Sequence, residues 1–479
     1  MTESLPEHLL ESFSEFVDVH VGLHFPRERW PDLARGAGVV AAELGFDSVE
    51  ACVQALMQVP VDTGRIEVLA RHLTIGETYF FRDPNELDLL RDHVLPGLIA
   101  SRRSGERRLR LWSVACSTGE EAYTLAIVVR NALPDIQDWN VTILATDINP
   151  QAVRKAEAGL FSEWSFRSVP RWVKASHFRK LSSGLYQVVP ETRDMVKFAC
   201  LNLVDDVYPS LANDTNAMDA ILCRNVLMYF SPQQSGRVLA KLCHSLVDQG
   251  WLVVSPGDAF SVTVPDLESV CFAGTTVFRK QGIAASSPAE RRLDAGGQPG
   301  TTALEGCGPE SVRAGELDEA TRCYSAGHYA EASERLSSCV ERGGASPEVL
   351  RLLAQSFANE GKLADALAWN ERELVSNKAD PESHYLRASI LLEQGNTGGA
   401  TRSFRDALCL EPGFVPAHIA LGNLSRREGD VESARRHYRN ALRALAECQR
   451  DQPVRGADGM TAGRLADTIA SLMEMECVA

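Results

Sequence analysis

Several features that would assign a chain to a class at once are missing from this sequence. No run of about 18 apolar residues occurs, so no membrane-spanning helix and no membrane insertion are predicted. The opening segment MTESLPEHLLESF has no basic stretch followed by an apolar one. We therefore expect no secretory signal and a cytoplasmic protein.

Basic side chains are in deficit, because 49 Lys and Arg face 64 Asp and Glu, a formal net charge of −15. Such a chain repels phosphate backbones on average, so nucleic acid is not expected as a partner. The twelve cysteines include no CxxC pair and are too few for a disulfide scaffold, which indicates reduced thiols. The eleven histidines show no ligand spacing, and we predict no metal site.

What is present is an ordinary soluble composition, 44% apolar and 24% charged, over 479 residues, enough for two to four domains. The first hundred residues show helical spacing of apolar side chains. From about 107 to 280, apolar strands such as RLRLWSVAC and NVTILATDI alternate with amphipathic helices, a pattern typical of a parallel, doubly wound α/β sheet. A segment rich in Gly, Ala, Ser and Pro follows, which predicts a flexible linker.

The last third of the chain is a repeat with a period of 34 residues. Glycines recur in one register and alanines in another, at Gly327, Gly361, Gly395 and Gly429 and at Ala332, Ala366, Ala400 and Ala434. This pattern resembles the tetratricopeptide repeat, in which small residues let the two helices of each hairpin approach closely. We expect three good units, a weaker first unit near 313–345, and a capping helix within 459–476.

The chemistry-bearing residues of the α/β part lie after its strands. Glu120 and Glu121 open the helix that follows the first strand, where they could face a ligand or simply stabilise the helix dipole. Asp147 follows the second strand, where it could hold ribose hydroxyls or cap the next helix. Both alternatives stay open from spacing alone. No GxGxxG and no P-loop motif is present, so dinucleotide and nucleotide triphosphate sites are weak possibilities.

Five motifs in order resemble those of the chemotaxis receptor methyltransferases, the CheR family: TIGETYFFRD, WSVACSTGEEAYTLAI, ATDINPQAVRKAEAGLF, FACLNL and LCRNVLMYF. The resemblance covers about residues 10–280. It implies a helical N-terminal domain and a Rossmann-like methyltransferase domain with a small β insertion. It also implies methyl transfer from S-adenosylmethionine (AdoMet), which leaves S-adenosylhomocysteine, to glutamates of chemoreceptors.

The expected segments are a CheR-type N-terminal domain at 1–85, the methyltransferase domain at 86–280, the linker at 281–315, the repeats at 316–445, and a capping helix or tail at 446–479. By motif match, the residues expected to contact AdoMet are Thr78, Arg82, Glu121, Asp147, Asn202, Leu203, Arg224 and Asn225. Arg82 and Tyr229 fall where the family places residues closest to the reacting methyl group.

Four features depart from the family pattern. Gly76 stands where Asn is common, and Ser255-Pro256-Gly257-Asp258 stands where a G-x-S-E-like turn is usual. Residues 1–70 hold four basic side chains against twelve acidic ones, so the basic receptor-docking face of other members is missing. The β insertion, expected around 178–198, is short, as in members that need no tethering pentapeptide.

The leading hypothesis is a protein-glutamate O-methyltransferase acting on the cytoplasmic helices of a chemoreceptor. The repeats would dock an unidentified protein partner or regulate access. The alternative is a non-catalytic scaffold that senses AdoMet and acts through its repeats.

Overall fold

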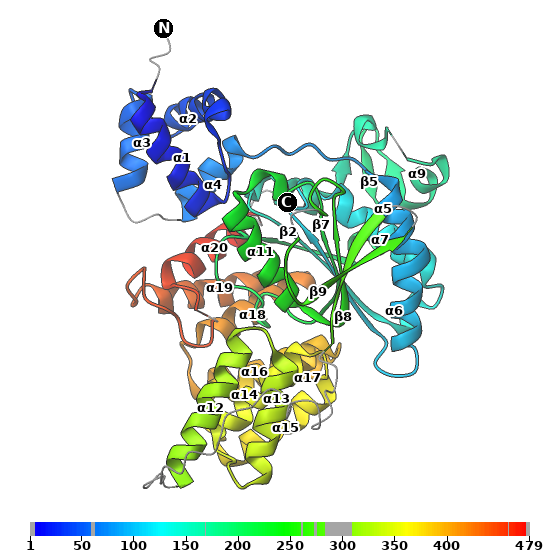
Figure 1. Cartoon of the computed structure of the whole chain (residues 1–479), viewed down its shortest axis with the longest axis vertical. Helices are drawn as coiled ribbons and strands as arrows, with labels where there is room; N and C mark the ends of the chain where they lie inside the picture. The colour runs from blue at the N-terminus through cyan, green and yellow to red at the C-terminus, as the bar shows by residue number, and fades with distance from the viewer. Residues whose placement is uncertain are drawn as a thin grey trace, which may run out of the picture.

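The structure is a computed structural model that describes residues 5–58, 63–167, 169–259, 262–272, 275–282, 309–457 and 459–475 (Figure 1). Most of the predicted linker, residues 283–308, lies outside the described residues, as do the last four residues of the predicted tail. No described helix is long and apolar enough to cross a membrane.

Four helices and a 3-10 turn form the N-terminal part: α1 (Glu7–Val21), η1 (Arg27–Arg29), α2 (Trp30–Glu43), α3 (Val49–Gln58) and α4 (Thr63–Leu73). Their apolar faces share one core, which includes Phe13, Val17, Leu33 and Leu69. An extended segment, 74–83, then leads to α5 (Pro84–Leu89), the π-helical turn η2 (Leu90–Val94) and α6 (Leu95–Arg102). This segment carries the TIGETYFFRD motif from the helical part to the sheet.

A seven-stranded sheet in the order β6-β2-β1-β7-β8-β10-β9 is the centre of the α/β part of the chain. Its strands are β1 (Arg108–Val114), β2 (Asn140–Asp147), β6 (Val196–Cys200), β7 (Met218–Cys223), β8 (Leu246–Val254), β9 (Leu267–Phe272) and β10 (Thr275–Lys280). The first five in spatial order run parallel, as the alternation of strands and helices predicts. β10 and β9 add an antiparallel edge, so the sheet is mixed.

Helices cover both faces of this sheet. The helices between residues 120 and 245 are α7 (Glu120–Ala132), α8 (Pro150–Ala158), α9 (Arg171–His177), α10 (Pro190–Arg193) and α11 (Pro232–Ser245), with short turns η3 (Ile136–Asp138), η4 (Glu163–Phe166) and η5 (Leu227–Tyr229). Of these, α9 packs on the β insertion and not on the main sheet. α11 packs on one face, while α6 and α7 pack on the other. The sequence predicts that the helix after 231 continues to 249, but β8 already begins at Leu246, where it pairs with Met218 of β7.

The β insertion is a separate three-stranded sheet, β3 (Leu160–Phe161), β5 (Tyr186–Val188) and β4 (Phe178–Lys180), in the order β3-β5-β4. The insertion begins at Leu160, shortly after the end of α8, and not at the expected position 178. Phe198 belongs to β6 of the main sheet, so the insertion also ends earlier than expected. Its aromatic core joins Phe161, Phe166 and Phe178 to Phe80 of the TYFFRD segment.

Four helical hairpins form the repeat array: α12 (Pro309–Ser325) with α13 (Tyr329–Glu341), α14 (Pro347–Asn359) with α15 (Leu363–Ser376), α16 (Pro381–Glu393) with α17 (Thr397–Leu410), and α18 (Val415–Arg427) with α19 (Val431–Leu445). The four in-phase glycines turn between the helices of each hairpin with φ near +80°, which glycine adopts without strain. The four in-phase alanines are fully buried. α20 (Ala462–Met475) packs on α19. The predicted repeat architecture is therefore confirmed.

Candidate active site

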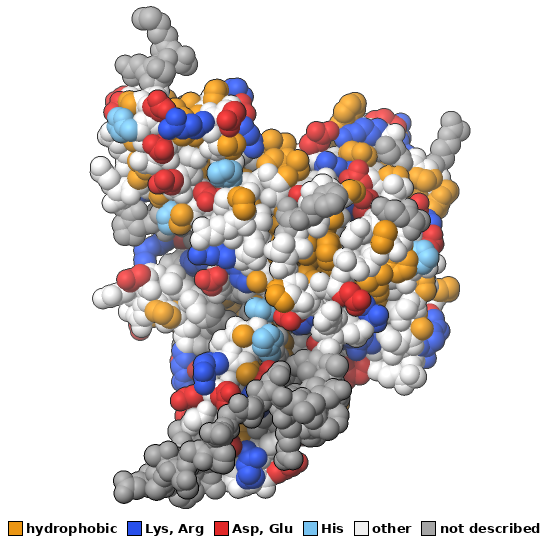
Figure 2. Space-filling model, viewed as in Figure 1, with side chains coloured by type: hydrophobic (Ala, Val, Ile, Leu, Met, Phe, Trp, Pro, Cys, Tyr) orange, Lys and Arg blue, Asp and Glu red, His pale blue; other side chains and the backbone are white. Residues whose placement is uncertain are grey.

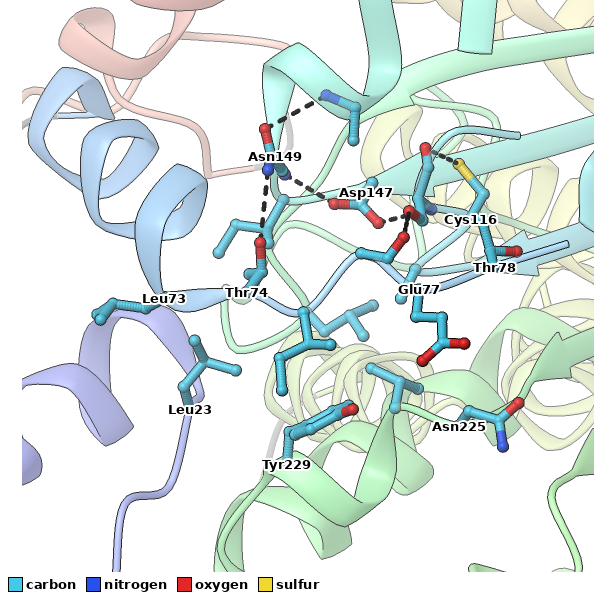
Figure 3. A pocket seen from close by; sticks show the side chains of 18 of the residues that line it. Leu23, Leu73, Thr74, Glu77, Thr78, Cys116, Asp147, Asn149, Asn225 and Tyr229 are labelled. Carbon is cyan, nitrogen blue, oxygen red and sulfur yellow. Dashed lines mark hydrogen bonds between the residues drawn. The ribbon is translucent and has the colours of Figure 1, made fainter. Parts of the chain in front are cut away.

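One cleft lies where the N-terminal helices, the segment 74–83 and the carboxyl ends of the parallel strands meet (Figure 3). The space between its walls, including the solvent at its open mouth, is about 1170 Å³. Figure 3 shows Leu23 approaching from the N-terminal helices, Asp147 and Asn149 from the end of β2, and Asn225 with Tyr229 from the segment after β7. Open α/β sheets bind their ligands at this end of the strands.

All nine residues that the motifs point to line this cleft: Thr78, Arg82, Glu121, Asp147, Asn202, Leu203, Arg224, Asn225 and Tyr229. They come from positions spread over about 150 residues of sequence. The fold therefore brings the whole predicted set together around one space.

The loop between β1 and α7 shapes one wall. Ala115, Ser117 and Gly119 have left-handed backbone conformations, with φ of 54°, 51° and 92°. A side chain at Gly119 would place its Cβ 2.8 Å from the Cβ of Ala156, so only glycine lets the loop pass this close to α8. The tight loop turns the backbone N–H of Ser117 toward the end of β2.

Asp147 is held by two backbone donors. Ser117 N donates to Asp147 Oδ2 and Asn149 N donates to Oδ1, both at 2.8 Å. Burial raises the pKa of this carboxyl group. The helix cap of α8 is Asn149, whose Oδ1 accepts from the N–H groups of Gln151 and Ala152. The capping alternative thus applies to Asn149, and the Asp147 carboxylate keeps lone pairs for hydroxyl donors.

Glu120 and Glu121 have different environments. Glu120 accepts from the hydroxyls of Thr118 and Ser165 at 2.6 and 3.0 Å, so it ties α7 to the β insertion. Glu121 lines the cleft and accepts from Ser113 Oγ at 2.8 Å and from Arg224 Nη1 at 3.0 Å. Burial raises the pKa of Glu121, while the Arg224 charge opposes that shift.

Arg224 is nearly buried, with 2% of its side chain exposed. Besides Glu121, it donates to the backbone carbonyl of Arg82 at 2.6 Å and lies 3.7 Å from the Glu86 carboxylate. The guanidinium therefore fixes Glu121 and the turn at Arg82.

Arg82 reaches the cleft with 30% of its side chain exposed, and its Nη1 donates to the backbone carbonyl of Glu77 at 2.8 Å. Tyr229 lies in η5, and its backbone carbonyl accepts from His24 N at 2.7 Å. Within the described residues, the Tyr229 hydroxyl has no hydrogen-bond partner. Arg82 and Tyr229 thus retain free polar groups at the cleft.

Asn202, Leu203 and Asn225 are more constrained than the motifs suggest. Asn202 Nδ2 donates to the carbonyl of His20 at 2.8 Å, which joins the loop after β6 to α1. Leu203 packs into the core beneath the sheet. Asn225 has a φ of 57°, and its backbone N–H donates to Ser255 Oγ.

The two local departures from the family pattern have visible consequences. At Gly76, where Asn is common, Ser117 Oγ donates to the backbone carbonyl at 3.1 Å, so a bond between the two loops is present without an Asn side chain. Ser255, in the unusual turn after β8, supplies the hydroxyl that fixes Asn225.

The sequence patterns missed the contribution of the N-terminal helices to the cleft wall, namely Val21, Leu23, His24, Phe25 and Arg29. The one available signal was Gly22, which ends α1 with a φ of 82°. A Cβ at Gly22 would lie 2.4 Å from the Phe230 ring, so the glycine allows a close contact with the cleft-lining segment after β7. No group of three potential metal ligands occurs among the described residues.

Comparisons with known proteins match both parts of the chain. A family described as CheR methyltransferase, SAM binding domain, matches residues 76–277. A second, described as the middle TPR-like domain of cilia and flagella-associated protein 70, matches residues 350–458.

Individual proteins add to these matches. The probable biofilm formation methyltransferase WspC of Pseudomonas aeruginosa is 27% identical over 394 residues, 80% of this chain and 87% of that protein. A chemotaxis protein methyltransferase of Borreliella burgdorferi is 31% identical over 196 residues, 40% of this chain and 68% of that protein. A crystal structure of MamA aligns with 29% of this chain and 81% of its own, at 17% identity and a TM-score of 0.28.

Proposed function

The chain belongs to the CheR methyltransferase family, and from this premise we propose that it transfers a methyl group from AdoMet to glutamate side chains of a chemoreceptor. The match to the SAM-binding domain implies that the chain binds AdoMet. The observation that carries the finer proposal is the cleft that nine motif residues line together. The product would be a glutamyl methyl ester.

The donor set suits the proposed cofactor. Asp147 offers carboxylate oxygens that each receive only one backbone N–H, so ribose hydroxyls can donate to them. Glu121 offers a fixed negative charge to the cationic methionyl end. The carboxylates of Asp147 and Glu121 would repel the phosphates of a nucleotide, whereas AdoMet contains no phosphate.

The chemistry needs no strong base. A glutamate carboxylate has a reference pKa near 4.3 and is already a nucleophile at neutral pH. When bound, AdoMet supplies a methyl carbon on a positively charged sulfur, which departs as a neutral thioether. The acceptor oxygen forms the new C–O bond as the C–S bond breaks, and no proton moves. Arg82 would hold the acceptor carboxylate, and the Tyr229 hydroxyl would orient it.

Positioning of the acceptor against the donor then supplies most of the rate acceleration. Holding acceptor and donor in line contributes up to about 7 to 11 kcal/mol to such reactions.

We further propose that the repeats dock a protein partner and that the enzyme works in the cytoplasm on receptor helices.

Transfer of labelled methyl from AdoMet to a co-expressed receptor tests this function. We expect label that mild base releases, as from an ester. Label that survives base would indicate N-methylation, and AdoMet binding without any transfer would favour the scaffold alternative.

The roles at the reacting centre are tested by Arg82→Ala and Tyr229→Phe. We expect kcat to fall about a hundredfold for the first and about tenfold for the second. AdoMet affinity, measured by calorimetry, should change less than kcat in both. Normal ester formation by Arg82→Ala would remove the role proposed for that residue.

A further inference from the structure

The charge of the repeat array reverses along its length. The second helices of the first two hairpins, α13 and α15, together carry six carboxylates and two arginines. The corresponding helices of the last two hairpins, α17 and α19, carry six arginines and two carboxylates. A chain with a net charge of −15 therefore concentrates positive charge at one end of its array.

The arginines follow the repeat register. Arg402 and Arg436 are 34 residues apart, as are Arg405 and Arg439. In the first two hairpins the same two registers hold Glu334 and Ala368, and Ser337 and Glu371. Because stacked repeats bring equivalent positions side by side, these arginines form a row across two hairpins. Arg443 extends the row along α19. We name Arg402, Arg405, Arg436, Arg439 and Arg443 the basic stripe.

The basic stripe is exposed and not neutralised. All five side chains lie on the surface, and among the described residues none has a carboxylate within ion-pair distance. Arg436 and Arg439 make only neutral contacts, to Ser433 Oγ and to the carbonyl of Arg435. Burial, the neighbouring His418 and the charges of Arg436 and Arg405 together lower the pKa of His437 to about 4.

The N-terminal helices have no such stripe. Arg27 pairs with Glu7, Arg35 with Asp32 and Arg71 with Glu43, at 3.1, 3.0 and 2.7 Å. The few cations there are thus balanced by nearby carboxylates, in a region that is acidic overall. An acidic partner would be repelled by these helices and attracted by the end of the array.

The basic end of the array lies close to the helices that border the cleft. α19 packs on α20, α20 packs on α4, and α4 ends at Leu73, which lines the cleft. Figure 1 shows α19 and α20 directly below α4, and Figure 2 shows Lys and Arg side chains over this region. A rod-like partner that lies along α19, α20 and α4 would contact both the basic end of the array and the border of the cleft.

We propose that the basic stripe docks the acidic helical surface of the receptor that carries the methyl-accepting glutamates. This inference rests on the proposed function, because it names the surface that receives that substrate. The acceptor region is acidic through its own glutamates, and each ester formed removes one negative charge. The stripe would therefore hold the unmethylated receptor more tightly than the methylated one. Charged contacts of this kind govern encounter and selectivity, and they weaken with salt.

The test replaces Arg402, Arg405, Arg436 and Arg439 together by Gln in the full chain. The matched control is Glu334→Gln with Glu371→Gln, which changes the same registers at the acidic end. We measure KM for a receptor cytoplasmic fragment, kcat and the AdoMet Kd, at about 0.05 M and about 0.5 M NaCl. For the fourfold variant we expect KM to rise about tenfold at low salt, with kcat and AdoMet Kd unchanged. The difference should vanish at high salt, and the control should match the wild-type chain or bind slightly more tightly.

Binding of the receptor fragment is measured separately by fluorescence anisotropy, so the stripe is tested even if no methyl is transferred. Absence of transfer by the wild-type chain would contradict the proposed function, whereas equal receptor binding by wild-type and fourfold variant would overturn the docking role. Mixed phosphatidylserine–phosphatidylcholine vesicles and duplex DNA serve as other polyanions. Loss of vesicle or DNA binding with an unchanged receptor KM would assign the stripe to those surfaces and overturn the proposal.

Discussion

Arg224 donates to Glu121 and to the backbone of Arg82 from a side chain that is almost completely buried. The motif match assigns it to the cofactor, but its hydrogen bonds are made to the protein. Its planar guanidinium joins the Glu121 carboxylate and the Arg82 carbonyl at fixed angles, which a lysine ammonium cannot reproduce. We therefore infer that Arg224 affects AdoMet through the position of Glu121.

The Arg224→Lys variant separates charge from geometry. The charge stays, but the fork that spans Glu121 and the Arg82 carbonyl is lost, so we expect the AdoMet Kd to rise roughly tenfold. Thermal unfolding should also occur at lower temperature, because Glu121 and Glu86 lose part of their compensation. Calorimetric titration with AdoMet measures the first effect. An unchanged Kd would show that Glu121 keeps its position without Arg224.

For single residues, the sequence predicted which side chains line the cleft but not which hydrogen bonds they make. Asp147 and Asn149 could each have capped α8, and only the hydrogen bonds assign the cap to Asn149. Asn202 lines the cleft, and no motif indicates that its amide donates to the carbonyl of His20, 182 residues away. Long-range partners of this kind leave no local pattern in a sequence.

The loop after β6 is the element through which the repeat array reaches the cleft. Asn202 and Leu203 line the cleft, and two residues later Asp205 accepts from Arg464 of α20 at 2.5 Å. Lys241 of α11 donates to the carbonyls of Val204 and Asp205. α20 therefore holds one end of a loop that lines the cleft.

We predict that Arg464→Gln weakens AdoMet binding about three- to tenfold, because the loop loses its ion pair and becomes less ordered. Arg450→Gln is the control. Arg450 pairs at 2.8 Å with Asp467, which lies in α20 like Arg464, but Arg450 does not touch the loop. Calorimetry with AdoMet measures both variants. Equal losses in the two would mean that α20 stability, and not the Asp205 contact, governs affinity.

Elements with strong periodicity were predictable, and elements defined by their neighbours were not. Apolar runs gave the parallel strands, and the 34-residue register gave all four hairpins. The antiparallel strands β9 and β10 have neither a continuous buried run nor a strict alternation of buried and exposed residues, so the sequence pattern did not reveal them. The two-residue β3 exists only because β5 pairs with it.

The whole molecule is held together by the turns of the repeats, which lie against the methyltransferase region. Glycines 327, 361 and 395 approach His244, Arg108 and Asn140 respectively, and Leu211 packs into the core of the array. Near the other end, Arg426 pairs with Glu157 of α8 at 3.5 Å. These contacts show that the array is docked along its length. No sequence pattern predicts such an interface, because each side is assembled from distant segments.

His244 makes part of this interface sensitive to pH. Burial, with Lys280 and His328 nearby, lowers its pKa to about 4, whereas a histidine in an unfolded chain titrates near 6.5. The unfolded state therefore binds the proton first, and stability falls as pH drops from about 6.5 toward 4, by at most about 3 kcal/mol. The His244→Gln variant should lose less stability between pH 7 and 5 than the wild-type chain. Calorimetric unfolding at both pH values measures this, and equal losses would contradict it.

Glu393 links the array to the sheet through both its carboxylate and its backbone carbonyl. Its carboxylate lies 2.8 Å from Arg108 and 3.5 Å from Arg110, accepts from Asn216 Nδ2 at 2.9 Å, and is 3% exposed. Its backbone carbonyl also accepts from Asn140 Nδ2 at 2.6 Å. The carboxylate thus compensates two arginines that β1 buries at the edge of the sheet opposite the cleft.

Replacing Glu393 by Ala leaves both guanidiniums buried without the carboxylate that lies nearest to them. Breaking a buried ion pair in this way costs about 3 to 5 kcal/mol, and the array can avoid that cost by leaving the sheet so that water reaches Arg108 and Arg110. We therefore expect a lower unfolding temperature and a larger radius of gyration in small-angle scattering. Glu428→Gln, on the exposed surface of the last repeat, should change neither. A Glu393→Ala chain that is destabilised but equally compact would mean that the remaining turn contacts suffice to hold the array in place.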